Sequence, residues 1–224
     1  MPASKSPLLF PVTTVRYLAL LLLLAATTRV VVLAAPADLP PVLLDWIAGQ
    51  PTLPDLKVDF TMTRKLPALK EPVTTTGSMW RLRDGRFRWQ VGEPPMNILV
   101  FDGTTAHSWE EGSEWKELDG ESRKARSWMD LLSGQAATLG ELDRRFTVRV
   151  LESTPGSATV ALDPRAAMTR KYLREIRLQL DPQSHHLKSL MIFQGNDTEI
   201  GIRFEEPVEM ASIHPDVLKP MMLQ

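Results

Sequence analysis

The sequence predicts a mainly β protein with about eleven antiparallel strands, a helix before them and helices in the middle. Apolar and polar residues alternate with a period of two in many short runs, as in residues 85–91. Asp-Gly pairs at 84–85 and 102–103 separate such runs, and they favour tight turns because glycine tolerates positive φ. Residues 121–142 form the one long interior stretch without alternation, and short helices fit this stretch better.

The first 37 residues have the pattern of a secretory signal peptide. Lys5 and Arg16 supply a basic region, residues 17–26 are apolar, and small residues around Ala35 suit cleavage. A retained membrane anchor is the alternative, but Arg29 interrupts the apolar run, which is short for a span of ~20 residues. We expect residues 1–37 to be removed, and residues 38–224 to form one mature domain in the periplasm.

Composition excludes several classes of function. The chain has no cysteine, so disulfides, thiolate chemistry and lipid attachment to an N-terminal cysteine are excluded. Removing residues 1–37 leaves 23 basic and 27 acidic residues, a net charge of −4. A mildly acidic chain lacks the basic footprint that nucleic acid requires, so no nucleic-acid partner is expected.

The expected elements follow in order along the chain. Residues 38–50 predict a short amphipathic helix, with prolines in its first turn and Gly49 at its end. Strands are then predicted at 55–63, 74–82, 85–91, 97–101, 105–110 and 114–118. After the non-alternating stretch, strands resume at 145–151, 157–163, 173–181, 186–194 and 198–206. No repeat or linker divides them, which indicates a single domain.

Residues 77–109 also contain a more specific motif. Its members are Met79-Trp80, Arg83, Phe87-Arg88-Trp89, Pro94, Ile98-Leu99-Val100 and Asp102-Gly103. In this order and spacing, the segment resembles the core motif of the LolA family of periplasmic lipoprotein carriers. The sequence departs from the family at three places: Asp84-Gly85 replaces a frequent proline, His107 and Trp109 replace a frequent Trp and Tyr, and the segment after Pro207 lacks the family's C-terminal pattern.

The resemblance implies a single long antiparallel sheet curled into an incomplete half-barrel. Its concave face would be covered by the N-terminal helix and by a helical lid at about 121–142. The family's function would be to hold the acyl chains of lipoproteins in an apolar cavity. Cargo would come from an inner-membrane ABC transporter of the LolCDE type and pass to an outer-membrane acceptor such as LolB. The resemblance implies no cofactor, and we expect a monomer.

The resemblance also implies roles for individual residues. Arg83 would lock the lid by donating to its backbone carbonyls, although a solvated strand arginine is the alternative. Phe87 would contact a partner near the cavity mouth, although core packing is the alternative. Further candidates for the cavity or the lid are apolar: Trp80, Trp89, Ile98, Val100, Trp128, Leu131 and Leu132. Each of these also fits ordinary core packing.

Catalytic and metal-binding patterns are weak. The histidines, at 107, 185, 186 and 214, lack the spacing of metal ligands, and no nucleophile elbow or phosphate-binding loop is present. We therefore expect neither an enzyme nor a metal site. Two other functions stay open. One is a related carrier for another amphiphile, such as a glycolipid or a pigment ester. The other is a lipid-sensing or interaction module, like the N-terminal domain of the anti-sigma regulator RseB.

Overall fold

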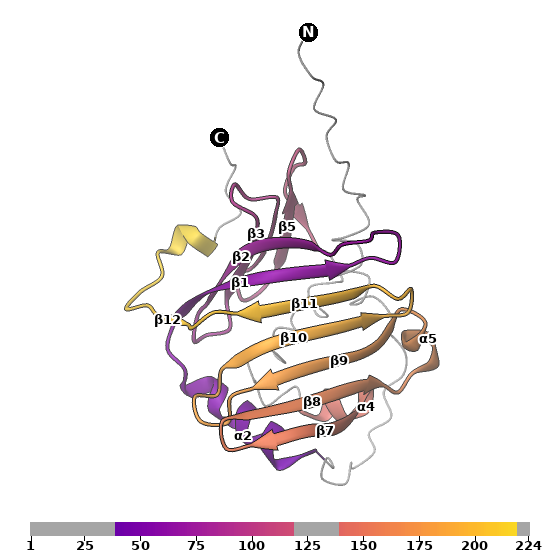
Figure 1. Cartoon of the computed structure of the whole chain (residues 1–224). Coiled ribbons are helices and arrows are strands. Elements are labelled where there is room, and N and C mark those ends of the chain that lie inside the picture. Colours follow the sequence, from indigo (N-terminus) through magenta and orange to yellow (C-terminus); the bar gives the residue numbers. More distant parts are fainter. Residues whose placement is uncertain (1–38, 119–138, 219–224) are drawn as a thin grey trace.

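The computed structural model describes residues 39–118 and 139–218, which form one twelve-stranded antiparallel sheet with short helices (Figure 1). The strands are β1 (Leu56–Lys65), β2 (Val73–Arg81), β3 (Phe87–Val91), β4 (Asn97–Phe101), β5 (Ala106–Glu110), β6 (Lys116–Glu117), β7 (Phe146–Thr154), β8 (Ser157–Pro164), β9 (Leu173–Leu180), β10 (Leu187–Gln194), β11 (Glu199–Phe204) and β12 (Val208–Glu209). The helical elements are α2 (Pro41–Gly49), η1 (Gln50–Thr52), α4 (Leu139–Arg145), α5 (Ala167–Arg170) and η3 (Pro215–Leu218).

The strand order is β6-β5-β4-β3-β2-β1-β11-β10-β9-β8-β7, and β12 pairs with the start of β1. Each half of the sheet is thus a meander of sequential antiparallel neighbours. The pairing of β1 with β11, from Phe60–Phe204 to Lys65–Glu199, joins the two halves. Since β6 and β7 are not paired with each other, the sheet is open rather than closed into a barrel.

The predicted Asp-Gly turns are present. Gly85 and Gly103 have φ values of 89° and 99°, in the region where glycine is free of the Cβ clash. The Asp102 carboxylate accepts hydrogen bonds from the backbone N–H groups of Thr104 and Thr105, both at 2.8 Å. These contacts keep the β4–β5 turn tight and fix the register of the two strands.

One face of the sheet carries the main core. Val160, Leu162, Ile176, Leu178 and Leu180 point to this face from β8 and β9, and their side chains are fully buried. Apolar area removed from water stabilises the fold by roughly 25 cal/mol per Å². We call this the concave face, because the sheet curls around it.

Helix α2 packs on the concave face. Its buried residues Leu43, Trp46 and Ile47 belong to the same apolar cluster as the β8 and β9 side chains. Pro41 occupies the first turn, where its missing N–H leaves no bond unmade. In Figure 1, α2 lies at the end of the lower strands where β9 turns into β10.

The fold class predicted from the sequence is confirmed: the protein is mainly β, with one open antiparallel sheet and a helix before it. Helix α2 begins at Pro41 rather than at residue 38, and α5 and the two-residue β12 were not expected. Of the predicted lid, residues 139–142 belong to α4, whereas the rest lies outside the described residues. The predicted signal peptide also lies outside them. In the described ranges, no helix is long and apolar enough to cross a membrane.

Candidate functional site

A row of apolar side chains crosses β1 to β4 on the concave face. The strand register places Val58 beside Met79, Met79 beside Trp89, and Trp89 beside Leu99. Val58 is buried, whereas the other three are only half-buried. The same face is fully buried over β8 and β9, so packing is less complete along this row than over those two strands. We call Val58, Met79, Trp89 and Leu99 the apolar row, and it is the candidate binding surface.

An aromatic cluster borders the apolar row. The Phe60 and Trp89 rings stack with centroids 4.1 Å apart, and Phe204 lies 6.2 Å from each of them. Gly77 makes this stack possible, since a Cβ there would lie 2.4 Å from Phe60 Cζ and 2.3 Å from the Gln90 carbonyl oxygen. The absent side chain on β2 thus lets Phe60 lean across to Trp89.

Arg81 lies at the end of β2, on the same face as the apolar row and buried beneath η1. Its Nη1 donates to the Gln50 carbonyl, and its Nη2 donates to the Leu53 and Pro54 carbonyls, each at 3.4 Å. The Nε atom is buried and has no hydrogen-bond partner among the described residues. Burial lowers the pKa of Arg81, although the nearby Asp55 carboxylate opposes this shift.

Arg81 therefore connects the sheet to the segment that follows helix α2. No carboxylate forms an ion pair with it within residues 39–118 and 139–218, so its described hydrogen-bond acceptors are backbone carbonyls, and the Asp55 carboxylate acts only through its charge. Contacts of 3.4 Å are long for hydrogen bonds, which indicates a weak attachment. The resemblance implies that Arg83 donates hydrogen bonds to backbone carbonyls. In the described residues, Arg81 makes bonds of this kind, and their acceptors lie in and just after the N-terminal helical segment.

Arg83 itself lies in the β2–β3 turn and is exposed. Its backbone N–H donates to Asp55 Oδ1 at 2.8 Å, which ties the turn to the start of β1. The lid segment that its guanidinium would reach is outside the described residues, as are Trp128, Leu131 and Leu132. The lid-locking role of Arg83 and the lid residues therefore stay predictions.

The four sheet candidates for the cavity do not share a face. Trp80 pairs with Arg88, which pairs with Val100, and Ile98 lies on that same side of β4. Trp89 points to the other, concave side. Because adjacent strand residues point in opposite directions, Trp80, Ile98 and Val100 lie on the convex side. These three residues therefore do not share the concave surface with Trp89, and their roles in a cavity or a lid stay predictions.

The C-terminal segment packs on this convex side. Ile213 and Leu218 form a buried cluster with Leu82, and Trp80 packs against it. Arg88 Nη1 donates to the Val217 carbonyl at 3.2 Å, and its guanidinium lies 5.8 Å from the Trp80 ring centroid. The segment after Pro207, which departs from the family pattern, thus forms a small second core.

Phe87 has no exposed surface and stacks on Phe101, with ring centroids 5.9 Å apart. It forms a buried cluster with Phe101 and Ala106, against which Trp89 and Leu99 pack. A side chain without exposed surface fits the core-packing alternative, and the partner contact of Phe87 stays a prediction. Phe87 lies beside the apolar row on the same face of the sheet.

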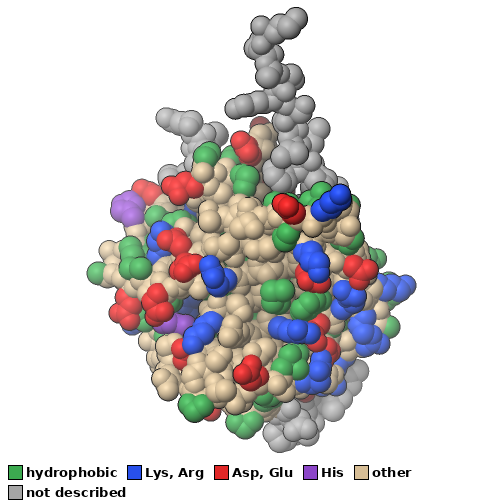
Figure 2. Space-filling view, in the orientation of Figure 1, with side chains coloured by type: hydrophobic (Ala, Val, Ile, Leu, Met, Phe, Trp, Pro, Cys, Tyr) green, Lys and Arg blue, Asp and Glu red, His purple; other side chains and the backbone are tan. Residues whose placement is uncertain are grey.

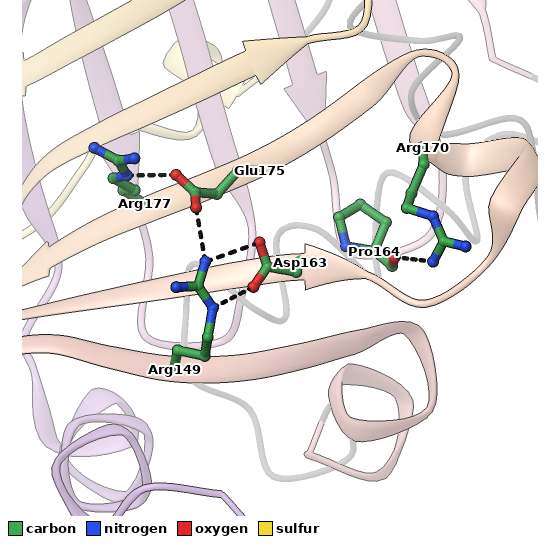
Figure 3. Close-up of polar contacts among 6 residues, drawn as sticks. All are labelled: Arg149, Asp163, Pro164, Arg170, Glu175 and Arg177. Atoms are coloured by element: carbon green, nitrogen blue, oxygen red, sulfur yellow. Dashed lines mark hydrogen bonds and ion pairs between the residues drawn. The ribbon is translucent and has the colours of Figure 1, made fainter.

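The convex face of the other half is polar. Figure 2 shows side chains of both charges spread over β7 to β10. Arg149 links Asp163 at 2.6 Å with Glu175 at 2.9 Å, and Glu175 also pairs with Arg177 (Figure 3). Exposed pairs of this kind contribute at most about 1 kcal/mol each, so this network is an ordinary solvated sheet surface. No group of His, Asp or Glu among the described residues could hold a metal ion.

The open sheet, with an apolar row on its concave face and a helix laid over that face, defines a class of half-barrel proteins. The sequence matches the family model described as outer membrane lipoprotein carrier protein LolA over residues 52–220. The chain therefore belongs to the LolA family. A comparison with curated protein sequences finds no match.

A comparison with solved structures finds similar chains at low identity. A LolA superfamily protein, NE2245 from Nitrosomonas europaea, is 7% identical, with a TM-score of 0.41 over 83% of this chain and 98% of that chain. LprF from Mycobacterium bovis is 15% identical, with a TM-score of 0.38 over 77% of this chain and 94% of that chain. MucB is 14% identical, with a TM-score of 0.41 over 80% of this chain and 62% of that chain. At these TM-scores the similarities carry no argument.

Sequence reasoning missed Arg81 and Met79 as site residues. The signal for both was present, because Met79 and Arg81 alternate with Trp80 along β2 and must share a face. Which face this is depends on the pairing of Val58 with Met79. That pairing joins segments about twenty residues apart and is not encoded in the alternation.

Proposed function

We propose that this protein is a periplasmic carrier that binds acyl chains on its concave face and shuttles acylated lipoproteins from the inner to the outer membrane. Membership of the LolA family supports the cargo class. The observation that carries the proposal is the apolar row, in which Met79, Trp89 and Leu99 are only half-buried beside a fully buried core. Side chains left partly uncovered on an inward face are available to a ligand.

The chemistry of the row suits flexible hydrocarbon. An acyl chain needs apolar contact area and few hydrogen bonds, and each buried methylene contributes about 0.8 kcal/mol. Met79 is unbranched and polarizable, so it adapts to chains of different shape. Trp89 supplies a broad rigid surface held by its stack on Phe60. We propose binding and release rather than catalysis.

Release requires the empty state to be stable as well. Arg81 stabilises a closed arrangement in which η1 lies over the sheet, through bonds that are long and easily broken. Cargo entry would separate these groups, and their re-formation would favour departure of the cargo. We propose an inner-membrane ABC transporter as the donor and an outer-membrane protein as the acceptor, with transfer down a gradient of affinity.

Met79→Glu tests the apolar row. A carboxylate there would have to lose its hydration when hydrocarbon covers it, which costs several kcal/mol for an unpaired charge. We expect the affinity for a fluorescent fatty-acyl probe to fall at least about tenfold, since 1.4 kcal/mol is a factor of ten. Half-burial of Met79 allows the fold to survive, which circular dichroism would check.

Thr76→Glu is the matched control, because Thr76 is exposed on the opposite face of the same strand. This variant should bind the probe like the original protein. Equal affinities for Met79→Glu and the original protein would remove the apolar row as the binding surface. Equal losses in both variants would show a general effect of charge rather than a site.

A further inference from the structure

Three connections lie at one end of the sheet, as the strand register requires. They are the β1–β2 hairpin (residues 66–72), the α5 loop (165–172) and the β10–β11 turn (195–198). Lys65 pairs with Glu199, and Gln194 pairs with Leu173, so the ends of these strands adjoin. Figure 1 shows the hairpin, the turn and α5 along its right-hand side. We call this the α5 end.

Large apolar side chains project from two of these connections. Leu69 in the hairpin is 47% exposed, and Met168 and Tyr172 in the α5 loop are 53% and 44% exposed. Nothing in the main core accounts for them, since they lie beyond the ends of the strands. Elsewhere in the described residues, the exposed large apolar side chains are Val150, Leu151 and Val208, all on strands. The α5 end is thus the place where apolar side chains protrude on loops.

Cations lie on the same connections and on the adjoining strand ends as these three apolar side chains, which we call the apolar tips. Three of them are paired: Lys65 with Glu199 at 3.3 Å, Arg165 with Asp143 at 3.3 Å, and Arg174 with Asp197 at 2.8 Å. Four others have no ion pair with a carboxylate within the described ranges: Lys70, Arg144, Arg170 and Lys171. Figure 2 shows Lys and Arg side chains gathered along the right-hand side, where the α5 end lies.

Backbone contacts hold two of these cations in place without cancelling their charge. Arg170 Nη1 donates to the Pro164 carbonyl at 3.0 Å (Figure 3), and Arg144 Nε donates to the Gly140 carbonyl at 2.9 Å. Apart from the three paired acids, the acidic residues in these connections and in α4 are Glu71 and Glu141. The α5 end therefore carries an excess of positive charge on a domain, residues 38–224, whose net charge is −4.

We propose that the α5 end docks reversibly on a bilayer that contains anionic phospholipid. Cations would lie among the headgroup phosphates, while Leu69, Met168 and Tyr172 enter the interface. The apolar tips stand on separate projecting loops, which suits a soft planar surface better than an acidic protein of fixed shape. Tyrosine suits such an interface because its ring is apolar and its hydroxyl polar. The inference goes beyond cargo binding, which uses the concave face.

A single fluorophore tests this docking. The chain has no cysteine, so Met168→Cys in the full chain takes one environment-sensitive label. We expect its emission to shift to the blue with phosphatidylcholine vesicles containing phosphatidylglycerol, and not with phosphatidylcholine alone. The shift should be lost at about 1 M salt, because the Debye length is then only ~3 Å and attraction between the cations and the phosphates is screened. Ser153→Cys, exposed near the opposite end of the sheet, is the matched control and should stay unshifted.

Charge removal supplies the second readout. Lys70→Gln with Lys171→Gln should weaken vesicle binding by about fivefold for each charge removed. Lys116→Gln, on the distant strand β6, should leave it unchanged. All variants share the same N-terminal segment, so its contribution is equal in each. Three results would overturn the inference. The label could shift equally at positions 168 and 153, or the protein could bind both vesicle types equally. Lys116→Gln could also weaken binding as much as the changes at Lys70 and Lys171 do.

Docking and cargo uptake can be told apart. After vesicles are removed by gel filtration, a docked protein loses its blue shift, whereas a protein that has extracted lipid keeps it. A shift that persists would overturn docking, because lipid would then stay bound at the α5 end without a bilayer. Loss of the shift in a protein that still binds the acyl probe would support both.

Discussion

At the scale of single residues, Arg81 is the most informative side chain. It is a buried cation whose described partners are carbonyl oxygens at 3.4 Å, and its Nε is unpartnered. Such a group contributes little to stability, because desolvation of the charge offsets the bonds it makes. Arg81 has a second effect, which comes from its position between the sheet and η1. It determines how firmly the N-terminal helical segment is held over the concave face.

Replacing Arg81 with methionine should separate these two effects. We expect the free energy of unfolding to change by less than about 1 kcal/mol, since an apolar side chain avoids the desolvation cost. The Leu53 amide, which donates to the Gln50 carbonyl at 3.2 Å, should exchange its hydrogen faster, because Arg81 no longer holds that carbonyl. Hydrogen exchange with mass spectrometry measures this directly.

Arg83→Met is the control for that experiment. Arg83 is exposed and contacts this region through its backbone N–H, which the substitution keeps. Exchange at Leu53 should therefore match the original protein. A strong loss of stability in Arg81→Met with unchanged exchange would mean that Arg81 is a structural core residue and not an attachment of the helical segment.

The residue types alone could not show which side chains lie on the concave face of the sheet and which on the convex face. The motif around Trp80, Arg83 and Phe87 identified the family, and the family model confirms it. It could not show that Trp80 and Trp89 lie on opposite sides, because that depends on the pairing of Trp80 with Arg88. It also could not show that Phe87 is fully buried, since burial depends on Phe101 and Ala106 from two later strands.

At the scale of elements, the β9–β10 turn positions helix α2. Gln50 Nε2, at the end of α2, donates to the His185 carbonyl, and the His185 ring packs so close that a Cβ on Gly49 would lie 2.2 Å from it. Asp181 shapes this turn by accepting hydrogen bonds from the N–H groups of Gln183 and Ser184 at 2.9 and 3.1 Å. The turn and the helix therefore depend on each other.

The stability of this turn should depend on pH through Asp181. Burial alone would raise the pKa of Asp181, but the Lys188 ammonium and the two N–H groups lower it to about 2. A folded pKa below the unfolded value stabilises the protein above the unfolded pKa, near 4, and this contribution is lost as pH falls towards 2. One pKa unit corresponds to about 1.4 kcal/mol, so the contribution is at most about 2.5 kcal/mol.

Asp181→Asn measures this contribution. The variant should be less stable than the original protein at pH 7, and the difference should shrink between pH 4 and pH 2. Urea unfolding at each pH gives the two free energies. A difference that stays the same at pH 2 would show that the turn depends on the shape of Asp181 rather than on its charge.

Secondary structure was the most predictable level. Alternation and turn residues predicted eleven strands, all of which are present, because strands such as β9 show one face to the core and one to the outside. β12 was missed because two residues carry no periodic signal, and α5 because a four-residue helix lies inside a loop-like sequence. Neither element has enough residues for a pattern to form.

At the scale of the whole molecule, the open sheet combines a full core and an incomplete one. The β8–β9 half is tightly packed beneath α2, whereas the apolar row on β2 to β4 is only half-buried. A rigid half holds the fold while the other half offers apolar surface, which is what a carrier with reversible binding requires.

Native mass spectrometry of the full chain, purified from its own cells without detergent, tests the carrier account most directly. The account predicts an adduct with the mass of an acylated lipoprotein, which Met79→Glu should lose and Thr76→Glu should keep. A smaller lipid or pigment adduct would support a related carrier with another cargo. A bare protein mass in every preparation, with no acyl probe bound, would contradict the account and favour a sensor or interaction module.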